Sequence, residues 1–264
     1  MSTYLITGIA GFIGSSLARA LLQQGHRVRG IDNFSTGKQE NISEIVDQID
    51  FREADVLDFE AVRWACRDVD YVLHEAAIPS VPRSIYNPLE TNRANVDGTL
   101  NVLVAAGDAK ASRVIYAASS SAYGDTPTLP KSEAMAPNAI FGDGKQSRDF
   151  TYVENAVHAN LLACKAPAND VAGKVFNVAS GRRVYLNDLY RILQELTGYS
   201  AQAKYGPERR GDVKDSLADL SRVEKYLGYR PTVSPEEDLR RTVEWYRSAE
   251  SEAAKRSALS FVSR

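Results

Sequence analysis

Residues 3–25 of the chain read TYLITGIAGFIGSSLARALLQQG, and this stretch decides the fold. It opens with a short β-rich run, after which Gly8, Gly11 and Gly14 follow with the spacing GxxGxxG. Apolar residues then recur at positions i, i+4, i+7 and i+8, the period of an amphipathic helix, and Gly25 is placed to end that helix. A strand, a glycine turn and a helix in this order predict the first unit of a dinucleotide-binding sheet.

The glycine turn is suited to binding a dinucleotide phosphate. Glycine is needed where the backbone turns tightly, approaches a pyrophosphate or packs a helix against a strand, and the helix that follows offers its first N–H groups to phosphate. Asp32 ends the next β-rich run, where a carboxylate accepts hydrogen bonds from the adenosine ribose and repels a 2′-phosphate. Glycines used only for packing, with Asp32 as a solvated turn residue, are the alternative. Strand, spacing, helix and acid agree, which favours binding of NAD.

The bulk composition is that of a globular protein. The chain has 264 residues, of which 44% are apolar and 25% charged, and its net charge of -2 argues against nucleic acid or an anionic membrane as a partner. Cys66 and Cys164 have no CxxC partner, no cluster of residues has metal-ligand spacing, and no apolar run approaches the length of a membrane span. A cytoplasmic protein without a metal site is expected.

Short β-rich runs alternate with helical patterns along most of the chain. This alternation predicts an α/β fold with a Rossmann-type, doubly wound parallel sheet, followed by a small, mostly helical C-terminal lobe. The predicted strands are 3–8, 27–32, 50–56, 69–75, 113–119 and 174–180, and the later helices are 90–108, 186–197 and 235–252.

The stretch DNFSTG at 32–37, taken with GxxGxxG, resembles the extended short-chain dehydrogenase/reductase family, whose nucleotide-sugar epimerases carry a DNxxxG stretch. The resemblance implies residues that line NAD and a structural role for Asn95. Each of them alone fits turn chemistry or core packing equally well, but the ordered set favours the cofactor. The cofactor residues are Gly8, Gly11, Phe12, Ile13, Gly14, Asp32, Asn33, Ser35, Thr36, Gly37, Asp55, Val56, Ala76 and Ala77.

A serine run, AASSSAYG at 117–124, follows the predicted fifth strand. The carboxyl end of a parallel strand faces the ligand crevice, although a polar strand end or turn would also fit. The resemblance implies that Ser119, four residues before the Tyr-Gly pair, is the catalytic serine that holds the sugar 4-oxygen, with Ser121 as a second candidate.

The same run discriminates between reactions of the family. Related dehydratases carry an Asp-Glu pair here and related decarboxylases a Glu, whereas this chain has Ser120, Ser121 and Ala122. The resemblance therefore favours oxidation and reduction at C4 of a UDP-sugar, that is, epimerisation. The sequence most resembles UDP-N-acetylglucosamine, UDP-glucose and UDP-glucuronate 4-epimerases, and it does not discriminate between these sugars.

Three further stretches resemble the family's substrate side: SVPRSIYNP at 80–88, GDGKQSRDFTYVEN at 142–155 and PERRGDVKDSLAD at 207–219. The planar guanidinium of arginine suits paired phosphate oxygens, although a surface arginine is usually only solvated. The implied sugar, diphosphate and ribose contacts are Ser80, Arg83, Ser84, Arg148, Arg209 and Asp212, while Asp149 is expected to be structural. The predicted domains are 1–138, which binds NAD, and 139–264, which binds the nucleotide sugar, with 174–197 returning to the Rossmann sheet.

One segment of the family pattern is absent. The family uses a YxxxK pair, in which lysine lowers the pKa of a tyrosine that takes the proton of the sugar hydroxyl. None of the 13 tyrosines is followed by lysine at the fourth position, and Tyr226 has Arg230 there. Asn138 runs directly into Ala139, so that one helix and one strand, roughly 50–60 residues and more than one βα unit, are missing. The segment is absent either from the molecule itself or only from the sequence as written.

Two hypotheses follow from this pattern. The chain is either an NAD-dependent UDP-sugar 4-epimerase or a catalytically inactive chain that binds NAD and UDP-sugar without turnover. A dehydratase or decarboxylase is a third, less favoured reading. The family resemblance implies a homodimer, although the missing helix belongs to the helix pair that usually forms the interface.

Overall fold

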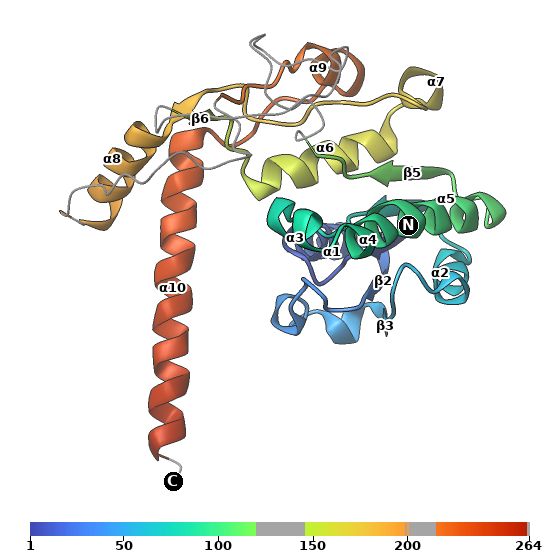
Figure 1. Cartoon of the computed structure of the whole chain (residues 1–264), viewed down its shortest axis with the longest axis horizontal. Coiled ribbons are helices and arrows are strands. Elements are labelled where there is room, and N and C mark those ends of the chain that lie inside the picture. The colour runs from blue at the N-terminus through green and yellow to red at the C-terminus, as the bar shows by residue number, and fades with distance from the viewer. Residues whose placement is uncertain (120–145, 199, 201–214, 263–264) are drawn as a thin grey trace. The chain divides into compact units, whose positions relative to one another are not determined.

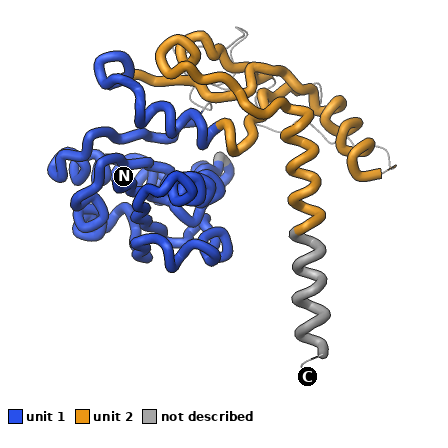
Figure 2. Tube along the Cα trace, turned by 180° about the vertical axis from the view of Figure 1, so that it is seen from behind, with its two compact units in different colours: residues 1–119, 156–173 blue, residues 120–155, 174–264 orange. Residues whose placement is uncertain are grey.

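The computed structural model describes residues 1–119, 146–198, 200 and 215–262. The chain divides into two compact units, which Figure 2 shows in different colours. Unit 1 comprises Met1–Ser119 and Ala156–Gly173, and unit 2 comprises Ser120–Asn155 and Lys174–Arg264. The domain boundary predicted at residue 138 lies outside the described residues.

Unit 1 is built on a sheet of five parallel strands in the order β3-β2-β1-β4-β5 (Figure 1). The order in which strands are added reverses at β1, which has β2 on one side and β4 on the other, while all strands stay parallel. This order confirms the predicted doubly wound sheet and places its ligand crevice at the carboxyl ends of β1 and β4. The strands are β1 (Thr3–Thr7), β2 (Arg27–Asp32), β3 (Asp50–Glu53), β4 (Tyr71–His74) and β5 (Arg113–Tyr116).

Helices cover both faces of this sheet. Successive residues of β1 enter different apolar clusters, Ile6 the one with α1 and α6, and Leu5 the one with α2 and α5. This alternation is expected of a strand that is buried on both faces. The helices are α1 (Phe12–Gln23), α2 (Phe59–Cys66), α3 (Val81–Tyr86), α4 (Pro88–Asn92), the π-helical turn η3 (Arg93–Asp97), α5 (Gly98–Asp108), α6 (Val153–Lys165) and α7 (Ala168–Val171), with short 3-10 turns η1 (Gln39–Asn41) and η2 (Val46–Gln48).

The first helix forms as its apolar period predicts. Leu17, Ala18 and Leu21 of α1 are fully buried in the cluster that the helix shares with β1 and β4. Gly25 follows the helix with a φ of +74°, a conformation that glycine adopts without strain. The predicted unit of strand, glycine turn and helix is therefore confirmed.

Unit 2 is mostly helical in its described part. The short strands β6 (Ser147–Arg148) and β7 (Val184–Tyr185) pair antiparallel. Helix α8 (Leu186–Thr197) has the bounds predicted from the sequence, α9 (Ser221–Leu227) was not predicted, and α10 (Pro235–Val262) begins as predicted and runs further.

The predicted strand at 174–180 is wrong. Residues 174–178 have no regular structure, and the described sheet of unit 1 ends at β5. A strand needs a neighbour for its N–H and C=O groups. The family strand that would precede this segment is missing from the chain, so the segment has no strand of that kind to pair with. Val175 is accordingly 56% exposed.

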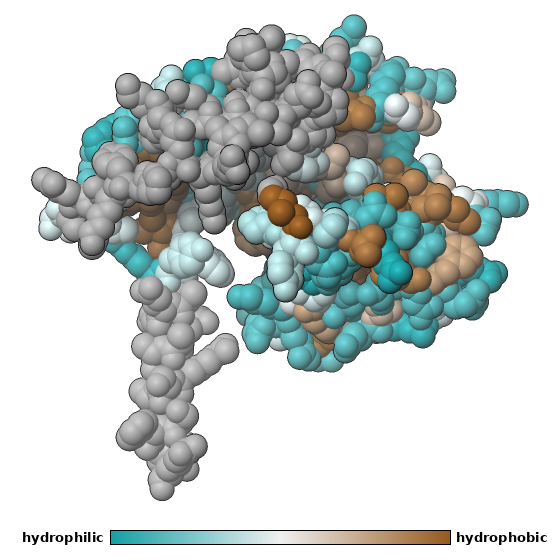
Figure 3. Space-filling view, in the orientation of Figure 1, coloured by the Kyte–Doolittle hydropathy of each residue, from teal (hydrophilic) through white to brown (hydrophobic). Residues whose placement is uncertain are grey.

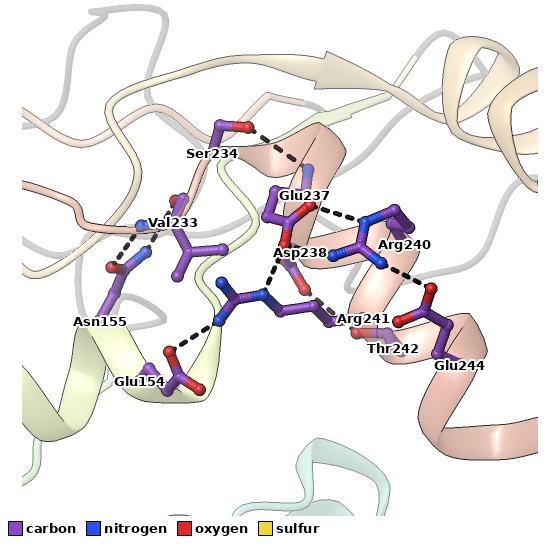
Figure 4. Close-up of polar contacts among 10 residues, drawn as sticks. All are labelled: Glu154, Asn155, Val233, Ser234, Glu237, Asp238, Arg240, Arg241, Thr242 and Glu244. Atoms are coloured by element: carbon purple, nitrogen blue, oxygen red, sulfur yellow. Dashed lines mark hydrogen bonds and ion pairs between the residues drawn. The ribbon is translucent and has the colours of Figure 1, made fainter. Parts of the chain in front are cut away.

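Polar contacts join the start of α6 to the entry of α10 within unit 2 (Figure 4). Asn155, which is fully buried, accepts hydrogen bonds from the N–H groups of Thr232 and Val233 and donates one to the carbonyl oxygen of Val233 at 3.1 Å. Arg241 pairs with Glu154 at 2.9 Å and with Glu237 at 2.7 Å. The stretch predicted to hold the diphosphate thus ends in a firmly anchored segment.

Candidate functional site

The glycine loop of unit 1 leaves no room for side chains. A Cβ atom on Gly14 would lie 2.3 Å from the carbonyl oxygen of Gly8, and a Cβ on Gly8 would lie 2.8 Å from the backbone nitrogen of Ala76. Gly8 also has a φ of +70°. These contacts require glycine at both positions, because backbone atoms cannot move aside as a flexible side chain can.

Helix α1 begins at this loop with its first turn open to a ligand. Its N-cap is Gly11, and in the described part of the chain no side chain caps it and no acid lies in its first turn. The unpaired N–H groups and the positive end of the helix dipole suit an anion. The loop and α1 therefore fit the pyrophosphate of a dinucleotide.

Asp32 lies at the carboxyl end of β2 and folds the stretch that follows it. Its side chain is 7% exposed, and its two oxygens accept hydrogen bonds from the N–H groups of Ala10 and Phe34, both at 2.8 Å. Asn33 donates to Asp55 at 2.7 Å and accepts from the N–H of Ser35 at 3.0 Å. The residues predicted to line adenosine are therefore brought together at one edge of the sheet, while their contacts to NAD stay predictions.

Val56, which follows β3, packs against Gly98 at the start of α5. Val56 is buried, and a Cβ atom on Gly98 would lie 2.6 Å from its side chain. The missing side chain at the start of α5 therefore lets the helix approach Val56. Helix α5 thus contacts Val56, the residue predicted to contact adenine.

A chain of hydrogen bonds fixes the loop after β4. His74 is buried and contacts Thr7 through Nδ1 at 2.6 Å and Thr99 through Nε2 at 2.9 Å. Asn95, in the turn η3, accepts from the N–H of Ile78 at 2.8 Å and donates to its carbonyl oxygen at 3.2 Å. Burial lowers the pKa of His74 to about 4, so the imidazole is neutral and serves as a structural hydrogen-bonding group. This arrangement supports the structural role expected for Asn95.

Glu75 is a residue that the sequence motifs did not single out. It follows His74 directly at the carboxyl edge of the sheet, and burial raises the pKa of its carboxyl group to about 7. Its Oε1 atom is the one buried side-chain oxygen or nitrogen in the described residues that lacks a hydrogen-bond partner. The sequence signal that could have identified Glu75 is an acidic residue between the end of a predicted strand and the Ala76-Ala77 pair.

The serine run begins at the end of β5. The N–H of Ala117 donates to the carbonyl oxygen of His74 at 3.1 Å, which continues the pairing of β4 and β5 toward Ser119. Ser119 is exposed at this carboxyl edge, as a residue that contacts the sugar requires. Ser121 lies outside the described residues.

The residues predicted to border the sugar on α3 have partners within the protein. Ser80 caps α3 by accepting from the N–H of Arg83 at 3.3 Å, and the N–H of Ser84 donates to the carbonyl oxygen of Ser80 at 2.9 Å. Arg83 forms an ion pair with Glu90. Local structure therefore explains Ser80 and Arg83 without a ligand, and their contact with sugar stays a prediction.

The diphosphate-binding residues were predicted in unit 2. Ser147, next to Arg148 on β6, bridges to Asp215 and accepts from the N–H of Ser216 at 3.0 Å. The strand that carries Arg148 thus lies beside the end of the stretch that carries Arg209 and Asp212. Arg209 and Asp212 themselves lie outside the described residues.

Asp149 is a structural hub of unit 2, as its position in the motif indicated. Its carboxylate accepts four hydrogen bonds, from the N–H and the hydroxyl of Ser180 at 2.9 and 2.6 Å and from the N–H groups of Gly181 and Ala218 at 3.1 Å each. A carboxylate with this many backbone donors holds loops together.

Two features are absent from the ranges that the structure describes. None of the helices there combines the length and the apolar character that crossing a bilayer requires. In the same ranges, His, Cys, Asp and Glu form no group of three that could hold a metal ion.

The sheet order, the glycine loop and Asp32 together define an NAD-binding protein of the Rossmann type. A model of the NAD dependent epimerase/dehydratase family matches residues 4–139 and, in a second match, residues 135–179. The chain belongs to this family, whose cofactor is NAD, and the extended short-chain dehydrogenase/reductase resemblance is confirmed.

Relatives and solved structures agree with this assignment. The UDP-glucuronate 4-epimerase of Thermodesulfobacterium geofontis is 27% identical, over 93% of this chain and 96% of its own length. The UDP-N-acetyl-alpha-D-glucosaminuronate decarboxylase of Bacillus cytotoxicus is 26% identical, over 94% and 98%. The structure of UDP-glucose 4-epimerase from Thermotoga maritima with UDP-glucose is 28% identical, with a TM-score of 0.86 over 94% of this chain and 99% of that one. UDP-glucuronic acid 4-epimerase from Bacillus cereus with UDP-glucuronic acid and NAD is 27% identical, with a TM-score of 0.81 over 90% and 96%.

The comparisons also bear on the missing segment. The alignment with the Thermodesulfobacterium geofontis relative is 314 positions long, 50 more than the 264 residues of this chain. The two matches to the family meet at residues 135–139, where the sequence pattern predicted the junction. The chain therefore covers 96% of that relative while it is shorter than the alignment, which fits an internal stretch that the relative carries and this chain lacks.

Proposed function

We propose that this chain binds NAD and a UDP-sugar and does not epimerise the sugar at the rate typical of its family. One combination of observations supports the proposal: the glycine loop, the uncapped first turn of α1 and Asp32 are in place in unit 1, and the YxxxK pair is missing from the full sequence. Binding and proton transfer depend on different residues, so one can remain without the other.

The chain's own residues account for binding. The loop from Gly8 to Gly14 and the first turn of α1 would hold the pyrophosphate, and Asp32 would lie beside the adenosine ribose. Ser119, at the end of β5, would hydrogen-bond the sugar 4-oxygen. NAD, when bound, supplies the acceptor for a hydride.

The missing pair accounts for the loss of turnover. Oxidation of a sugar hydroxyl needs a base that takes its proton as the hydride leaves. A positioned base contributes about 10²–10⁴-fold to such a step, and the loss of the lysine beside it adds to this. We therefore expect C4 epimerisation slower than that of the relatives by at least about this factor.

The test combines binding and turnover on one preparation. An intact mass of 29.0 kDa first verifies that the purified protein lacks the segment. Calorimetric titrations with NAD, and then with UDP-glucose, UDP-N-acetylglucosamine and UDP-glucuronate, should show binding. Chromatography of the same mixtures should show little or no C4 epimer, with a relative that carries the pair as the positive control. No NAD binding, or epimerisation at the rate of that control, would refute the proposal.

The second candidate is an active NAD-dependent UDP-sugar 4-epimerase in which another group replaces the tyrosine. The relatives favour it, because the Thermodesulfobacterium geofontis protein and the solved Thermotoga maritima structure are both 4-epimerases. The serine run favours it over decarboxylation, since Ser120, Ser121 and Ala122 supply no acid. Release of carbon dioxide from UDP-glucuronate would instead indicate a decarboxylase.

We also propose that the chain forms a homodimer through one face of unit 1. Large apolar side chains are exposed along consecutive helices, and Figure 3 shows apolar surface over α3, α4 and α5. Large apolar side chains exposed on neighbouring elements are a feature of interaction surfaces. The residues, between 43% and 91% exposed, are Ile85, Tyr86, Leu89, Val96, Leu100, Leu103 and Val104.

Light scattering tests this interface. Leu100→Lys should give the mass of a monomer, because a charge cannot be buried in an apolar contact without a partner. Val46→Lys, on the turn η2, is the matched control and should leave the mass at twice 29.0 kDa. A wild-type chain that is already monomeric at micromolar concentration would contradict the proposal.

A further inference from the structure

Glu75 carries a hydrogen-bonding oxygen with which none of the described residues forms a hydrogen bond. Its Oε1 atom is buried and has no partner in the described residues. Desolvation is the only cause of its raised pKa, so no nearby charge compensates for the burial of this carboxyl group. A buried polar atom without a partner destabilises the folded chain, and it calls for an explanation such as a ligand.

Glu75 lies at the carboxyl ends of β1 and β4, where a doubly wound sheet binds its ligand. Its N–H donates to the carbonyl oxygen of Thr7 at 3.2 Å, so the pairing of β1 and β4 extends to it. A Cβ atom on Gly8 would lie 3.0 Å from the carbonyl carbon of Glu75. The first glycine of the loop therefore rests on the backbone of this residue.

The face on which the side chain lies follows from strand alternation. His74 contacts Thr99 of α5 on one face of the sheet, and Leu73 packs in the cluster of α1 and α6 on the other. Side chains of successive residues alternate, so the carboxyl group of Glu75 lies on the face of α1. This is the face on which the glycine loop leads into the helix.

Four backbone donors near Glu75 are already engaged. The N–H of Gly8 donates to Ile31, that of Gly11 to Gly8, and that of Ala10 to Asp32. The N–H of Ala76 donates to the hydroxyl of Thr7 at 3.3 Å. These donors therefore leave Oε1 of Glu75 without a partner among the described residues, and a molecule bound at the carboxyl ends of β1 and β4 would supply one.

We propose that Glu75 is a cofactor-binding residue whose carboxyl group hydrogen-bonds the pyrophosphate–ribose part of bound NAD. This rests on the proposed binding of NAD. The ribose hydroxyls and phosphate oxygens of that part offer a hydrogen-bond partner to either form of the carboxyl group. The same bond would satisfy the oxygen that lacks a partner among the described residues.

Two substitutions separate a ligand contact from a merely structural role. Glu75→Gln keeps a donor and an acceptor, whereas Glu75→Leu keeps only the bulk of the side chain. We expect Glu75→Leu to weaken NAD binding about tenfold to a hundredfold, the loss of a hydrogen bond to a charged or polar ligand, and Glu75→Gln to remain within about threefold of wild type. The Tm of the free Glu75→Leu chain should not fall, because an unpartnered buried group is removed.

Calorimetry with NAD and with ADP-ribose, which lacks nicotinamide, is the measurement. The effect of Glu75→Leu should be equal for both ligands. Glu60→Leu, at an exposed site on α2, removes the same charge and should leave both affinities unchanged. Glu75→Ala is the second variant if Glu75→Leu fails to fold.

The outcomes are distinct. Wild-type affinity in Glu75→Leu or Glu75→Ala would overturn the inference, as would an effect on NAD that is absent for ADP-ribose. Failure of the wild-type chain to bind NAD would instead refute the proposed function. A lower Tm with unchanged affinity would assign Glu75 to folding alone.

Discussion

Replacing Glu75 with glutamine should change how the stability of the chain depends on pH. Burial raises the pKa of Glu75 to about 7, from a value of 4.5 in the unfolded chain. Burial lowers the pKa of the adjacent His74 to about 4, from 6.5. Both groups are thus held neutral in the fold, but their titrations act on stability in opposite directions.

The folded chain binds the proton of Glu75 more tightly than the unfolded chain does. The free energy of unfolding therefore falls as the pH rises from 4.5 to about 7. For His74 the unfolded chain binds the proton more tightly, so the free energy of unfolding rises as the pH rises from about 4 to 6.5. Each slope is about 1.4 kcal/mol per pH unit.

These slopes cancel in the wild-type chain between pH 4.5 and 6.5, the range that both titrations share. In Glu75→Gln only the slope of His74 remains. Relative to wild type, the variant should therefore gain about 3 kcal/mol in free energy of unfolding across these two pH units.

Urea unfolding of both chains at pH 4.5, 5.5 and 6.5 measures this difference, and subtraction removes the titrations that they share. Glu60→Gln, at an exposed position on α2, measures the effect of losing an acid that is in water. A difference between Glu75→Gln and wild type that stays constant within about 0.5 kcal/mol over this range would refute the reasoning. Glu75 would then be solvated in the folded chain.

Three further substitutions test the site. Gly14→Ala should abolish NAD binding in calorimetry, because its Cβ atom would lie 2.3 Å from the carbonyl oxygen of Gly8, whereas Gly107→Ala on α5, where a Cβ meets nothing, should bind NAD normally and gain about 0.5–1 kcal/mol of stability. Asp32→Asn should raise the ratio of NADP to NAD affinity by about tenfold or more, since one charge that repels the 2′-phosphate is removed. Asp149→Ala should lower the free energy of unfolding in urea by about 3 kcal/mol, because four hydrogen bonds lose their acceptor; a loss below about 1 kcal/mol would contradict its role as a hub.

The parts of the fold that local rules govern were predictable from the sequence. The turn at Gly8 needs a positive φ, Gly14 needs the absence of a side chain, and the apolar period of α1 needs a sheet to cover. Each requirement is visible within a few residues of the chain. The strand–turn–helix unit and the sheet built on it were therefore predicted with nearly correct bounds.

The errors arise where a residue depends on distant parts of the chain. Residues 174–180 have the composition of a strand, but a strand also needs a neighbour, and the junction after Asn138 removed the one expected beside it. Arg83 matches a sugar-binding motif, and its contact with sugar stays a prediction, but the ion pair that it forms with Glu90 of the next helix was not predicted. That Oε1 of Glu75 lacks a partner among the described residues is visible only once the hydrogen bonds of the fold are known. Composition and spacing hold none of this information.

The position of the junction explains why a cofactor cradle can persist without the catalytic pair. Strand β1, which carries the glycine loop, is flanked by β2 and β4, and all three precede the junction in sequence. Strand β5 pairs with β4 alone in the described sheet, and Tyr116 at its end is 50% exposed. The missing helix and strand would follow β5, so their loss falls at the edge of the sheet and not between the strands that hold NAD. Under the proposed function, binding depends on the centre of the sheet and proton transfer on residues beyond its edge, so a deletion there would remove the second function and leave the residues for the first in place.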